Sequence, residues 1–484
     1  MPLDSTDAPP PAPALKPLCV DFDGTLVKSD TLHDSLLVLL RTRPARLFSL
    51  PGKVLRGKAA FKAAVTDWVT LDIAHLPYNR KLLQYLQAER AKGRTIYLTT
   101  GADARLAQRI ADYLGVFSGV LGSDGLVNLT GAKKLDALRA RFGERGFDYI
   151  GNDVPDLALL VHASEPMVAN PSLRLRRRMR KLGVRPVRAF EERAHPFKSL
   201  VKAIRVHQWA KNLLIFLPLL LSHALNLSSF LAALLAFACF SLTASATYIL
   251  NDLLDIEADR RHTRKQRRPF AAGDLTGVQG LSVAALFLLL AMAGIQTLPV
   301  AFYGWLLVYL ATAFAYSTYL KRMALIDVLV LSGLYTLRIL AGGAATGTPI
   351  SHWLAGFSVF LFLSLAIVKR FAELENLRAS ASPPRNGRGY LVADIEQLRS
   401  FGTSSASAAV VIFAIYISGS EVTSLYRKPG YLWLVVPFMI LWLYRVWLLA
   451  SRGRLNEDPV VFAITDRMSL LIGVAVAAIV LLAI

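Results

Sequence analysis

Asp21 and Asp23 are two carboxylates two residues apart, in the run DFDGT. They directly follow residues 18–20, a short apolar run typical of a buried strand. Ligand sites in open α/β sheets lie at the carboxyl ends of strands. One carboxylate could attack phosphorus while the other protonates the leaving oxygen, and Mg²⁺ would neutralise the crowded negative charge. The spacing therefore predicts phosphoryl chemistry at this point of the chain.

A second acidic group lies in the run NDLLDIEADR, at the end of a long apolar segment. On a helix, Asp252, Asp255 and Asp259 would share one face, and Asn251 could join them. Acidic side chains at the end of a membrane span are costly unless they pair or bind something. The stripe therefore predicts Mg²⁺ ligation. The basic loop that follows, which includes Arg268, would help to bind a di- or polyphosphate.

Further polar residues stand near the ends of other apolar segments and could bind the same substrate. Asp327 is the most informative of them, because it opens a hydrophobic segment. The basic residues of this set could instead serve topology alone, and the nearby Trp209 could be an interfacial anchor. The candidate substrate-binding residues are Lys211, Asn212, Arg268, Tyr316, Lys321, Arg322, Asp327, Lys369, Arg370 and Glu373.

The composition separates this chain from two broad classes of protein. Of 484 residues, 54% are hydrophobic and only 18% are charged, which excludes a disordered chain. The apolar residues also come in runs too long for the core of one soluble globule. Two cysteines cannot form a disulfide framework or a cysteine metal cage. The net charge of +21 is compatible with nucleic acid, anionic lipid or a phosphorylated substrate.

Composition shifts along the chain predict four parts. Residues 1–16 read as a disordered tail, without the pattern of a signal peptide. Residues 17–170 alternate apolar runs with helical patterns, which predicts an α/β domain with a parallel sheet. Residues 171–199 read as a basic juxtamembrane linker, and its basic run at 174–181 would bind anionic lipid headgroups. No nucleic-acid partner is expected, because no recognised nucleic-acid-binding fold accompanies this run. Residues 200–484 read as an all-α membrane domain.

The membrane domain holds about nine apolar stretches long enough, or nearly so, to span a bilayer. The first is the weakest, because Pro218 and His223 interrupt it. Basic residues concentrate in alternate loops, so the positive-inside rule predicts a multi-pass protein of the inner or plasma membrane, with a cytoplasmic α/β domain, cytoplasmic active sites and an external C-terminus. The stretches lie near 212–226, 228–250, 277–296, 299–319, 325–345, 353–370, 404–420, 430–450 and 468–484.

Over residues 17–165, the chain resembles the haloacid dehalogenase (HAD) phosphohydrolases, a family with a Rossmann-like α/β fold and a DxDGT motif after its first strand. The resemblance implies that Asp21 is the nucleophile and Asp23 the general acid/base. It also implies that residues 30–75 form a small helical cap that restricts substrate choice. A catalytically silent docking domain is the alternative.

The remaining HAD motifs have matches further along the chain. The hydroxyl after the second strand would be Thr99, with Thr100 as the alternative, and the phosphate-steadying lysine would be Lys134, with Lys133 close behind. The acidic loop reads GNDVPD, and it has an amide where the family usually has its first aspartate. The implied Mg²⁺ ligands of this domain are Asp21, Asp23, Asn152, Asp153 and Asp156.

Over about residues 198–484, the chain resembles the UbiA superfamily of intramembrane transferases, through NDxxDxxxD followed by RP and Gly273. The resemblance implies nine transmembrane helices around a cavity open to the lipid, with Mg²⁺ held by Asn251, Asp252, Asp255 and Asp259. Several stretches, including KRFAEL at 369–374, look like the decaprenyl-phosphate phosphoribosyltransferases of the arabinan pathway.

This resemblance implies a two-step reaction. Phosphoribosyl diphosphate (PRPP) would transfer 5-phosphoribose to a polyprenyl phosphate, and the HAD domain would remove the 5-phosphate from the lipid-linked product. An aromatic prenyltransferase that uses a prenyl diphosphate, with the HAD domain as a regulatory or docking module, is the alternative. A transporter is disfavoured, because the acids gather at one membrane face rather than at mid-bilayer. An oligomer is possible.

Overall fold

The computed structural model describes residues 15–223, 226–379, 388–455 and 459–484, so the predicted tail lies almost wholly outside the described residues. The chain folds as two compact units. The first comprises Met1–Ile204 and Ile249–Ser282, and the second comprises Arg205–Tyr248 and Val283–Ile484. The segment that carries the acidic motif therefore groups with the α/β domain, although the sequence places it within the membrane half.

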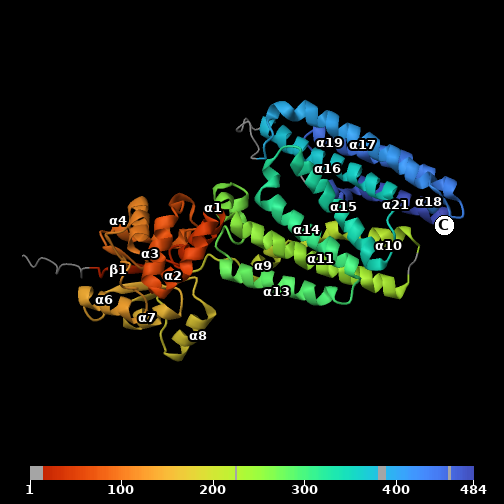
Figure 1. Ribbon diagram of the computed structural model, residues 1–484. Coiled ribbons are helices and arrows are strands. Elements are labelled where there is room, and N and C mark those ends of the chain that lie inside the picture. The colour runs from red at the N-terminus through yellow and green to blue at the C-terminus, as the bar shows by residue number, and fades with distance from the viewer. Residues whose placement is uncertain (1–14, 224–225, 380–387, 456–458) are drawn as a thin grey trace, which may run out of the picture. The chain divides into compact units, whose positions relative to one another are not determined.

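The first unit contains a six-stranded parallel sheet with the strand order β3-β2-β1-β4-β5-β6 (Figure 1). The central strand β1 is buried along its whole length, which agrees with its unbroken apolar sequence. The predicted parallel α/β architecture is therefore confirmed. The strands are β1 (Leu18–Asp21), β2 (Ile96–Asp103), β3 (Gly119–Ser123), β4 (Asp148–Gly151), β5 (Pro166–Ala169) and β6 (Arg188–Phe190).

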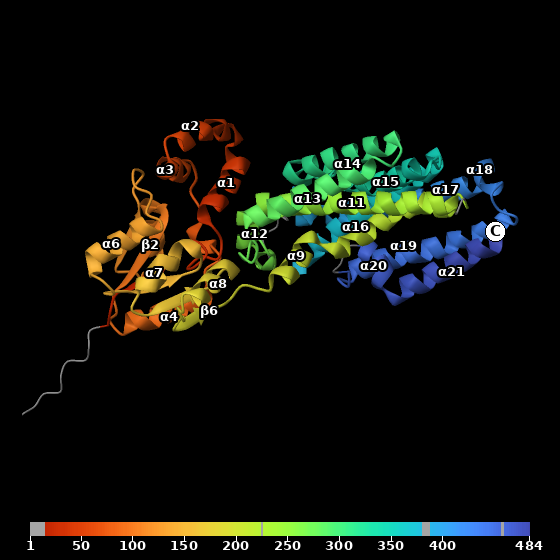
Figure 2. The ribbon, with the colours of Figure 1, turned by 90° about the horizontal axis from the view of Figure 1, so that it is seen from below.

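Helices connect these strands and also form the predicted cap between β1 and β2. The cap contains α1 (Thr31–Thr42), α2 (Leu50–Leu55) and α3 (Lys58–Trp68), and Figure 2 shows it at one edge of the sheet. Asp30 starts α1 by accepting hydrogen bonds from the backbone of Leu32 and His33. The other helices up to residue 204 are α4 (Arg80–Ala91), α5 (Ala104–Leu114), α6 (Ala132–Phe142), α7 (Leu157–His162), α8 (Leu173–Lys181) and α9 (Pro196–Ile204).

The α/β domain extends beyond the predicted boundary at residue 170. The basic run forms α8, whose Leu175 and Met179 are buried in the domain core while its arginines face outward. Strand β6 then pairs with β5 as the last strand of the sheet. The segment predicted as a linker therefore supplies a helix and a strand of the domain.

Long apolar helices dominate the rest of the chain. Among the described residues, seven are long and apolar enough to cross a membrane, and a pair bent by 76° would make an eighth span. The seven are α11 (Leu227–Leu254), α13 (Gly277–Ile295), α14 (Val300–Thr318), α15 (Ile326–Thr346), α16 (His352–Ala379), α17 (Ile395–Ser418) and α19 (Val435–Ser451). The bent pair is α20 (Pro459–Thr465) with α21 (Arg467–Ala483), and two further short helices are α12 (Ile256–Arg261) and α18 (Ser420–Thr423).

The predicted count of nine spans is not confirmed. The first predicted span contains a 3₁₀ segment, η4 (Val206–Phe216), followed by the five-residue helix α10 (Leu217–Leu221). Pro218 is the second residue of α10, and proline is tolerated in the first turn because its missing N–H has no intrahelical partner there. This stretch is therefore not one continuous span-length helix.

Glycine allows η4 to pack closely against α15 in the second unit. A Cβ atom added at Gly342 would lie 2.1 Å from the carbonyl oxygen of Ile215, closer than any real contact. Small residues serve the same purpose wherever membrane helices approach closely. The run LAGGAAT thus positions the segment that carries Lys211 and Asn212.

Candidate functional site

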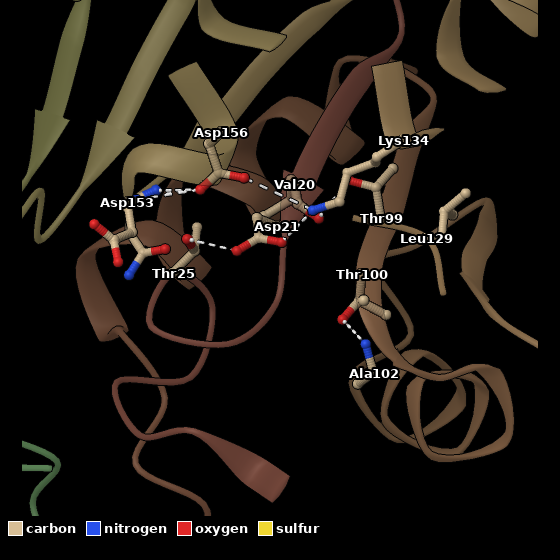
Figure 3. A network of polar contacts seen from close by, with 12 residues as sticks. Val20, Asp21, Thr25, Thr99, Thr100, Ala102, Leu129, Lys134, Asp153 and Asp156 are labelled. Atoms are coloured by element: carbon tan, nitrogen blue, oxygen red, sulfur yellow. Dashed lines mark hydrogen bonds and ion pairs between the residues drawn. The ribbon is translucent and has the colours of Figure 1, made fainter. Parts of the chain in front are cut away.

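The DFDGT run meets a lysine and a second aspartate at the carboxyl end of the sheet (Figure 3). Lys134 Nζ from α6 lies 2.6 Å from Asp21 Oδ1 and 3.7 Å from Asp156 Oδ1, and it donates a hydrogen bond to the Tyr149 hydroxyl at 3.1 Å. All four side chains are buried. A buried lysine between two carboxylates is the arrangement that could steady a phosphate beside a nucleophile.

The acidic loop is organised by Asp156. Its Oδ2 accepts the backbone N–H groups of Asn152 and Asp153 at 2.9 and 3.2 Å, and its Oδ1 accepts the Tyr149 hydroxyl at 2.8 Å. Asp156 therefore holds the loop, while the Asp153 carboxylate accepts a hydrogen bond from the Ser172 hydroxyl at 2.6 Å. A Cβ atom at Gly24 would lie 2.1 Å from Asn152 Nδ2, so this loop packs directly on the turn after Asp21.

The two aspartates of DFDGT occupy different electrostatic environments. Burial raises the pKa of Asp21 to about 6, against the opposing effect of the Lys134 charge. Burial and the Asp30 charge raise the pKa of Asp23 to about 7, although Thr31 donates two hydrogen bonds to it, each 2.8 Å long. The Asp23 carboxyl therefore holds its proton to a higher pH than the Asp21 carboxyl does. That difference suits a nucleophile and a general acid.

The structure separates the alternative residues of the HAD motifs. Thr99 pairs with Asp21 in the β1–β2 register, and its hydroxyl donates to the Val20 carbonyl at 3.3 Å. The Thr100 hydroxyl instead accepts the Ala102 N–H at 2.9 Å. Lys133 is exposed, whereas the neighbouring Lys134 is buried against Asp21. The geometry favours Thr99 and Lys134.

The predicted stripe of three acids is divided by a break in the helix. Helix α11 ends at Leu254, and Asp255 is the N-cap of α12. Asp252 Oδ1 and Asp259 Oδ2 lie 3.0 and 2.7 Å from the same atom, Arg268 Nη1. Asp255 instead forms an ion pair of 3.1 Å with Arg41. The structure therefore brings together two of the three acids and the predicted Arg268.

The acidic side chains at the two sites differ in how they could hold Mg²⁺. Within the described parts of the chain, no three His, Cys, Asp or Glu side chains form a group that could hold a metal by themselves. Mg²⁺ is usually bound by one or two carboxylates together with substrate phosphates. Asp252 and Asp259 fit that pattern, since they are buried and already share one cationic nitrogen. At the end of β1, the carboxylates of Asp21 and Asp23 have the same donor chemistry.

In the second unit, Asp327 and Arg370 form a buried ion pair. Arg370 Nε lies 2.6 Å from Asp327 Oδ2, and the two side chains are 1% and 0% exposed, respectively. Arg370 Nη1 also lies 2.6 Å from Glu373 Oε2, and its Nη2 donates to the Tyr316 hydroxyl at 3.4 Å. Four predicted substrate-binding residues are thus brought into one cluster.

Two members of this cluster were not predicted from the sequence. The Tyr390 hydroxyl donates a hydrogen bond to Asp327, and Arg388 Nη1 donates to the Tyr316 hydroxyl at 3.1 Å. Both residues follow α16 in a segment without hydrophobic periodicity. The positive charge of Arg388, read as a topology signal, was the only indication in the sequence.

The remaining predicted residues have varied surroundings. Asn212 is buried, donates to Ser241 Oγ at 2.9 Å and accepts from Arg338 Nε at 2.8 Å, so its amide positions η4 within the unit. Lys211 Nζ lies 5.5 Å from the centre of the Tyr335 ring. Lys321 and Arg322 lie in the 3₁₀ turn Leu320–Arg322, and Lys369 directly precedes Arg370 on α16. Arg338 was not predicted and gave no signal beyond its charge within an apolar helix.

Comparisons with known proteins identify relatives of the chain. Residues 213–473 match the sequence model of the UbiA prenyltransferase family. The uncharacterized protein y4nM of Sinorhizobium fredii is 38% identical over 463 residues, which cover 95% of this chain and 90% of that protein. The decaprenyl-phosphate phosphoribosyltransferase of Mycobacterium tuberculosis is 33% identical over 57% of this chain and 91% of its own length. The alignment with y4nM is long enough to include both halves of the chain.

Two solved structures resemble parts of the chain more distantly. A UbiA homologue from Archaeoglobus fulgidus bound to GPP and Mg²⁺ covers 58% of this chain and 99% of its own, with 17% identity and a TM-score of 0.45. A HAD family hydrolase from Salmonella enterica covers 35% of this chain and 67% of its own, with 20% identity and a TM-score of 0.25.

Proposed function

The chain belongs to the UbiA prenyltransferase family, as its sequence predicts, and we propose that it is a bifunctional phosphoribosyltransferase–phosphatase acting on a polyprenyl phosphate. It is a multi-pass membrane protein, since that family match coincides with at least seven span-length apolar helices among the described residues. The observation that carries the proposal is the 33% identity to a decaprenyl-phosphate phosphoribosyltransferase along nearly all of that relative's length. The proposed orientation places the α/β domain and both sites on the cytoplasmic side.

The proposed transfer breaks the C1–O bond of PRPP. A phosphate oxygen of the lipid attacks C1 as diphosphate leaves, and the product is polyprenyl-phosphoryl-5-phosphoribose. Asp252 and Asp259 would hold Mg²⁺, which would neutralise charge on the leaving diphosphate. Arg268, which already contacts both carboxylates, would turn toward the diphosphate oxygens. A phosphate nucleophile is already ionised, so the site needs no strong general base.

The cluster around Asp327 and Arg370 in the second unit supports phosphoribosyl transfer rather than aromatic prenyl transfer. The buried acid Asp327 is paired with Arg370 and accepts a hydrogen bond from Tyr390. Both oxygens of Asp327 are engaged, one by Arg370 and the other by Tyr390, which makes Asp327 a poor second metal ligand but holds the arginine in a fixed position. We assign Arg370, Arg388 and Tyr316 to orientation of a phosphorylated substrate, with Lys211, Lys321 and Lys369 as further phosphate ligands.

The proposed hydrolysis takes place at the end of β1. Asp21 attacks the 5-phosphate and forms an aspartyl phosphate, while Asp23 donates its proton to the leaving ribose oxygen. Asp23 then accepts a proton from the water that hydrolyses the aspartyl phosphate. Lys134 and the Thr99 hydroxyl would hold the phosphate during both steps.

A donor test distinguishes this function from aromatic prenyl transfer. Purified protein in detergent with Mg²⁺ receives polyprenyl phosphate and ribose-labelled PRPP, or separately a prenyl diphosphate and an aromatic acid. We expect label in the lipid phase and no alkylated aromatic product. An Asp252→Asn variant should lose transfer, and an Asp21→Asn variant should yield a lipid product that retains its 5-phosphate. Label that stays in water, or a dephosphorylated lipid from Asp21→Asn, would refute the corresponding half of the proposal.

A further inference from the structure

Arg260 directly follows Asp259 in the acidic motif, yet its side chain contacts the α/β domain of the same unit. Its Nη1 lies 2.8 Å from Asp34 Oδ2, and its Nη2 donates to Ser29 Oγ at 3.1 Å. Its Nε donates to the carbonyl of Ala271 at 3.2 Å. Every side-chain nitrogen of Arg260 is thus used at this junction, and two of the three bond to the α/β domain.

Ser29 and Asp34 border the loop that carries Asp23. Ser29 Oγ donates to Asp34 Oδ2 at 2.7 Å, and the Ser29 carbonyl accepts the Gly24 N–H at 3.2 Å. Thr31, two residues after Ser29, donates both its N–H and its hydroxyl to Asp23 Oδ1. The contacts of Arg260 therefore fix the two residues that close the loop around Asp23.

The ion pair lies inside the unit rather than on its surface. The side chains of Arg260 and Asp34 are only 4% and 5% exposed. The junction is close-packed beside it, since a Cβ atom at Gly273 would lie 2.7 Å from Lys28 Cβ. Such a pair holds its partners in one geometry, whereas an exposed pair would exchange with water.

We propose that Arg260, a residue of the transferase motif by sequence, is a positioning residue of the phosphatase. It holds the loop between Gly24 and Thr31 so that the Asp23 carboxyl faces the leaving oxygen of the substrate. The inference rests on the proposed phosphatase activity. It explains why this chain keeps residues 249–282 with the α/β domain, and it makes phosphatase geometry depend on a segment more than 200 residues away.

The test is hydrolysis of p-nitrophenyl phosphate by the full-length protein in detergent with Mg²⁺. Arg260→Met removes the charge and keeps most of the volume. A displaced catalytic group lowers rate by up to about 100-fold, so we expect kcat about ten- to a hundredfold lower, with KM changed less than about twofold. The control is Arg261→Gln, because the neighbouring Arg261 instead pairs with Asp72 at a half-exposed site; its kcat should match that of the wild type.

A double variant separates positioning from simple charge balance. Arg260→Met alone leaves the Asp34 carboxylate buried without its ion-pair partner. Adding Asp34→Asn removes that charge, so the melting temperature should recover toward that of the wild type. We expect kcat to stay low, because the contacts to Ser29 and Asp34 are still missing. Recovery of kcat together with the melting temperature would show that Arg260 only neutralises Asp34 and would overturn the inference.

Hydrogen exchange provides a readout that does not depend on activity. The Gly24 and Thr31 amides should exchange faster in the double variant than in the wild type, while amides of helix α5, which packs on β2 and β3, should not change. Unchanged exchange at both amides would also overturn the inference. The proposed phosphatase requires that the wild type hydrolyses the substrate with Mg²⁺ and that Asp21→Asn abolishes this hydrolysis. Failure of either result would refute the proposed phosphatase, and this inference with it.

Discussion

Lys134 is the residue on which the charge balance of the proposed phosphatase site depends. It contacts both Asp21 and Asp156 within the domain core. Loss of one partner from a buried ion pair costs about 3–5 kcal/mol. Lys134→Met should therefore lower the unfolding temperature of the full-length protein and abolish hydrolysis of p-nitrophenyl phosphate.

Lys133 provides a matched control for that variant. It is the preceding residue, it is exposed, and the sequence alone leaves it as an alternative to Lys134. Lys133→Met should leave both hydrolysis and unfolding temperature unchanged. If hydrolysis is lost in Lys133→Met and retained in Lys134→Met, the assignment of the phosphate-steadying lysine is wrong.

The Asp327–Arg370 pair permits a similar test in the second unit. Arg370→Met leaves Asp327 buried without its guanidinium, which should cost about 3–5 kcal/mol. Asp327→Asn combined with Arg370→Met removes both charges and keeps an acceptor for the Tyr390 hydroxyl, so much of the stability should return. Thermal unfolding in detergent measures both effects.

Transfer activity then decides whether this cluster binds substrate. We expect the stabilised double variant to remain inactive with PRPP and polyprenyl phosphate, because the guanidinium that orients the substrate is missing. A double variant that regains both stability and transfer would show that the pair serves folding alone, and substrate binding would then have to be assigned to other residues.

At the scale of elements, the contact between η4 and α15 depends on Gly342. A methyl group there would meet the backbone of Ile215, which cannot rotate away as a side chain could. Overpacking of this kind costs about 1–3 kcal/mol. Gly342→Ala should therefore lower the unfolding temperature and also transfer activity, since η4 carries Lys211.

Gly333 on the same helix is the control for that substitution. A Cβ atom there would meet nothing within 4 Å. Alanine is favoured over glycine within a helix by about 0.5–1 kcal/mol, so Gly333→Ala should be neutral or slightly stabilising. Equal effects of the two substitutions would contradict the close approach of η4 to α15.

The elements that could be predicted were those with a clear pattern. The apolar runs at 18–20, 95–98 and 147–150 lie in strands of the sheet, because a buried strand needs a continuous hydrophobic run. Helix α8 was taken for a linker because Leu175 and Met179, the residues that pack in the core, stand among six arginines and lysines. Two apolar positions one turn apart give too weak a periodicity to indicate a packed helix.

The site residues were predictable where a motif is contiguous and not where contacts are made at long range. The acids of the NDxxDxxxD motif could be proposed as metal ligands from the sequence, but their single stripe assumed a continuous helix, and the helix breaks at Asp255. The roles of Arg41 and Arg260 could not be found, because each joins segments about 200 residues apart. No local pattern encodes such a pair.

At the scale of the whole molecule, the net charge of +21 includes the basic side chains of helix α8. Helix α8 turns its arginines outward beside the exposed Leu173 and Leu182. A basic face flanked by apolar side chains is typical of binding to anionic lipid, with about 1 kcal/mol for each basic residue near the surface. The proposed anionic-lipid contact of the basic run therefore remains compatible with its place in the α/β domain.

A fluorescent label at the end of α8 tests this contact in the full-length protein. Cys19 and Cys239 are buried, so Leu182→Cys offers a selectively accessible thiol for an environment-sensitive dye. In nanodiscs that contain anionic lipid, the dye should report a less polar environment than in zwitterionic nanodiscs. The difference should diminish at 1 M salt, where the screening length falls to about 3 Å.

The difference between the two kinds of nanodisc should also disappear when Arg174, Arg177, Arg178 and Lys181 are changed to glutamine. A charge-matched variant with glutamine at Arg43, Lys53, Arg56 and Lys58 of the cap should retain the response. A response that survives the α8 changes and is lost with the cap changes would place the lipid contact on the cap instead.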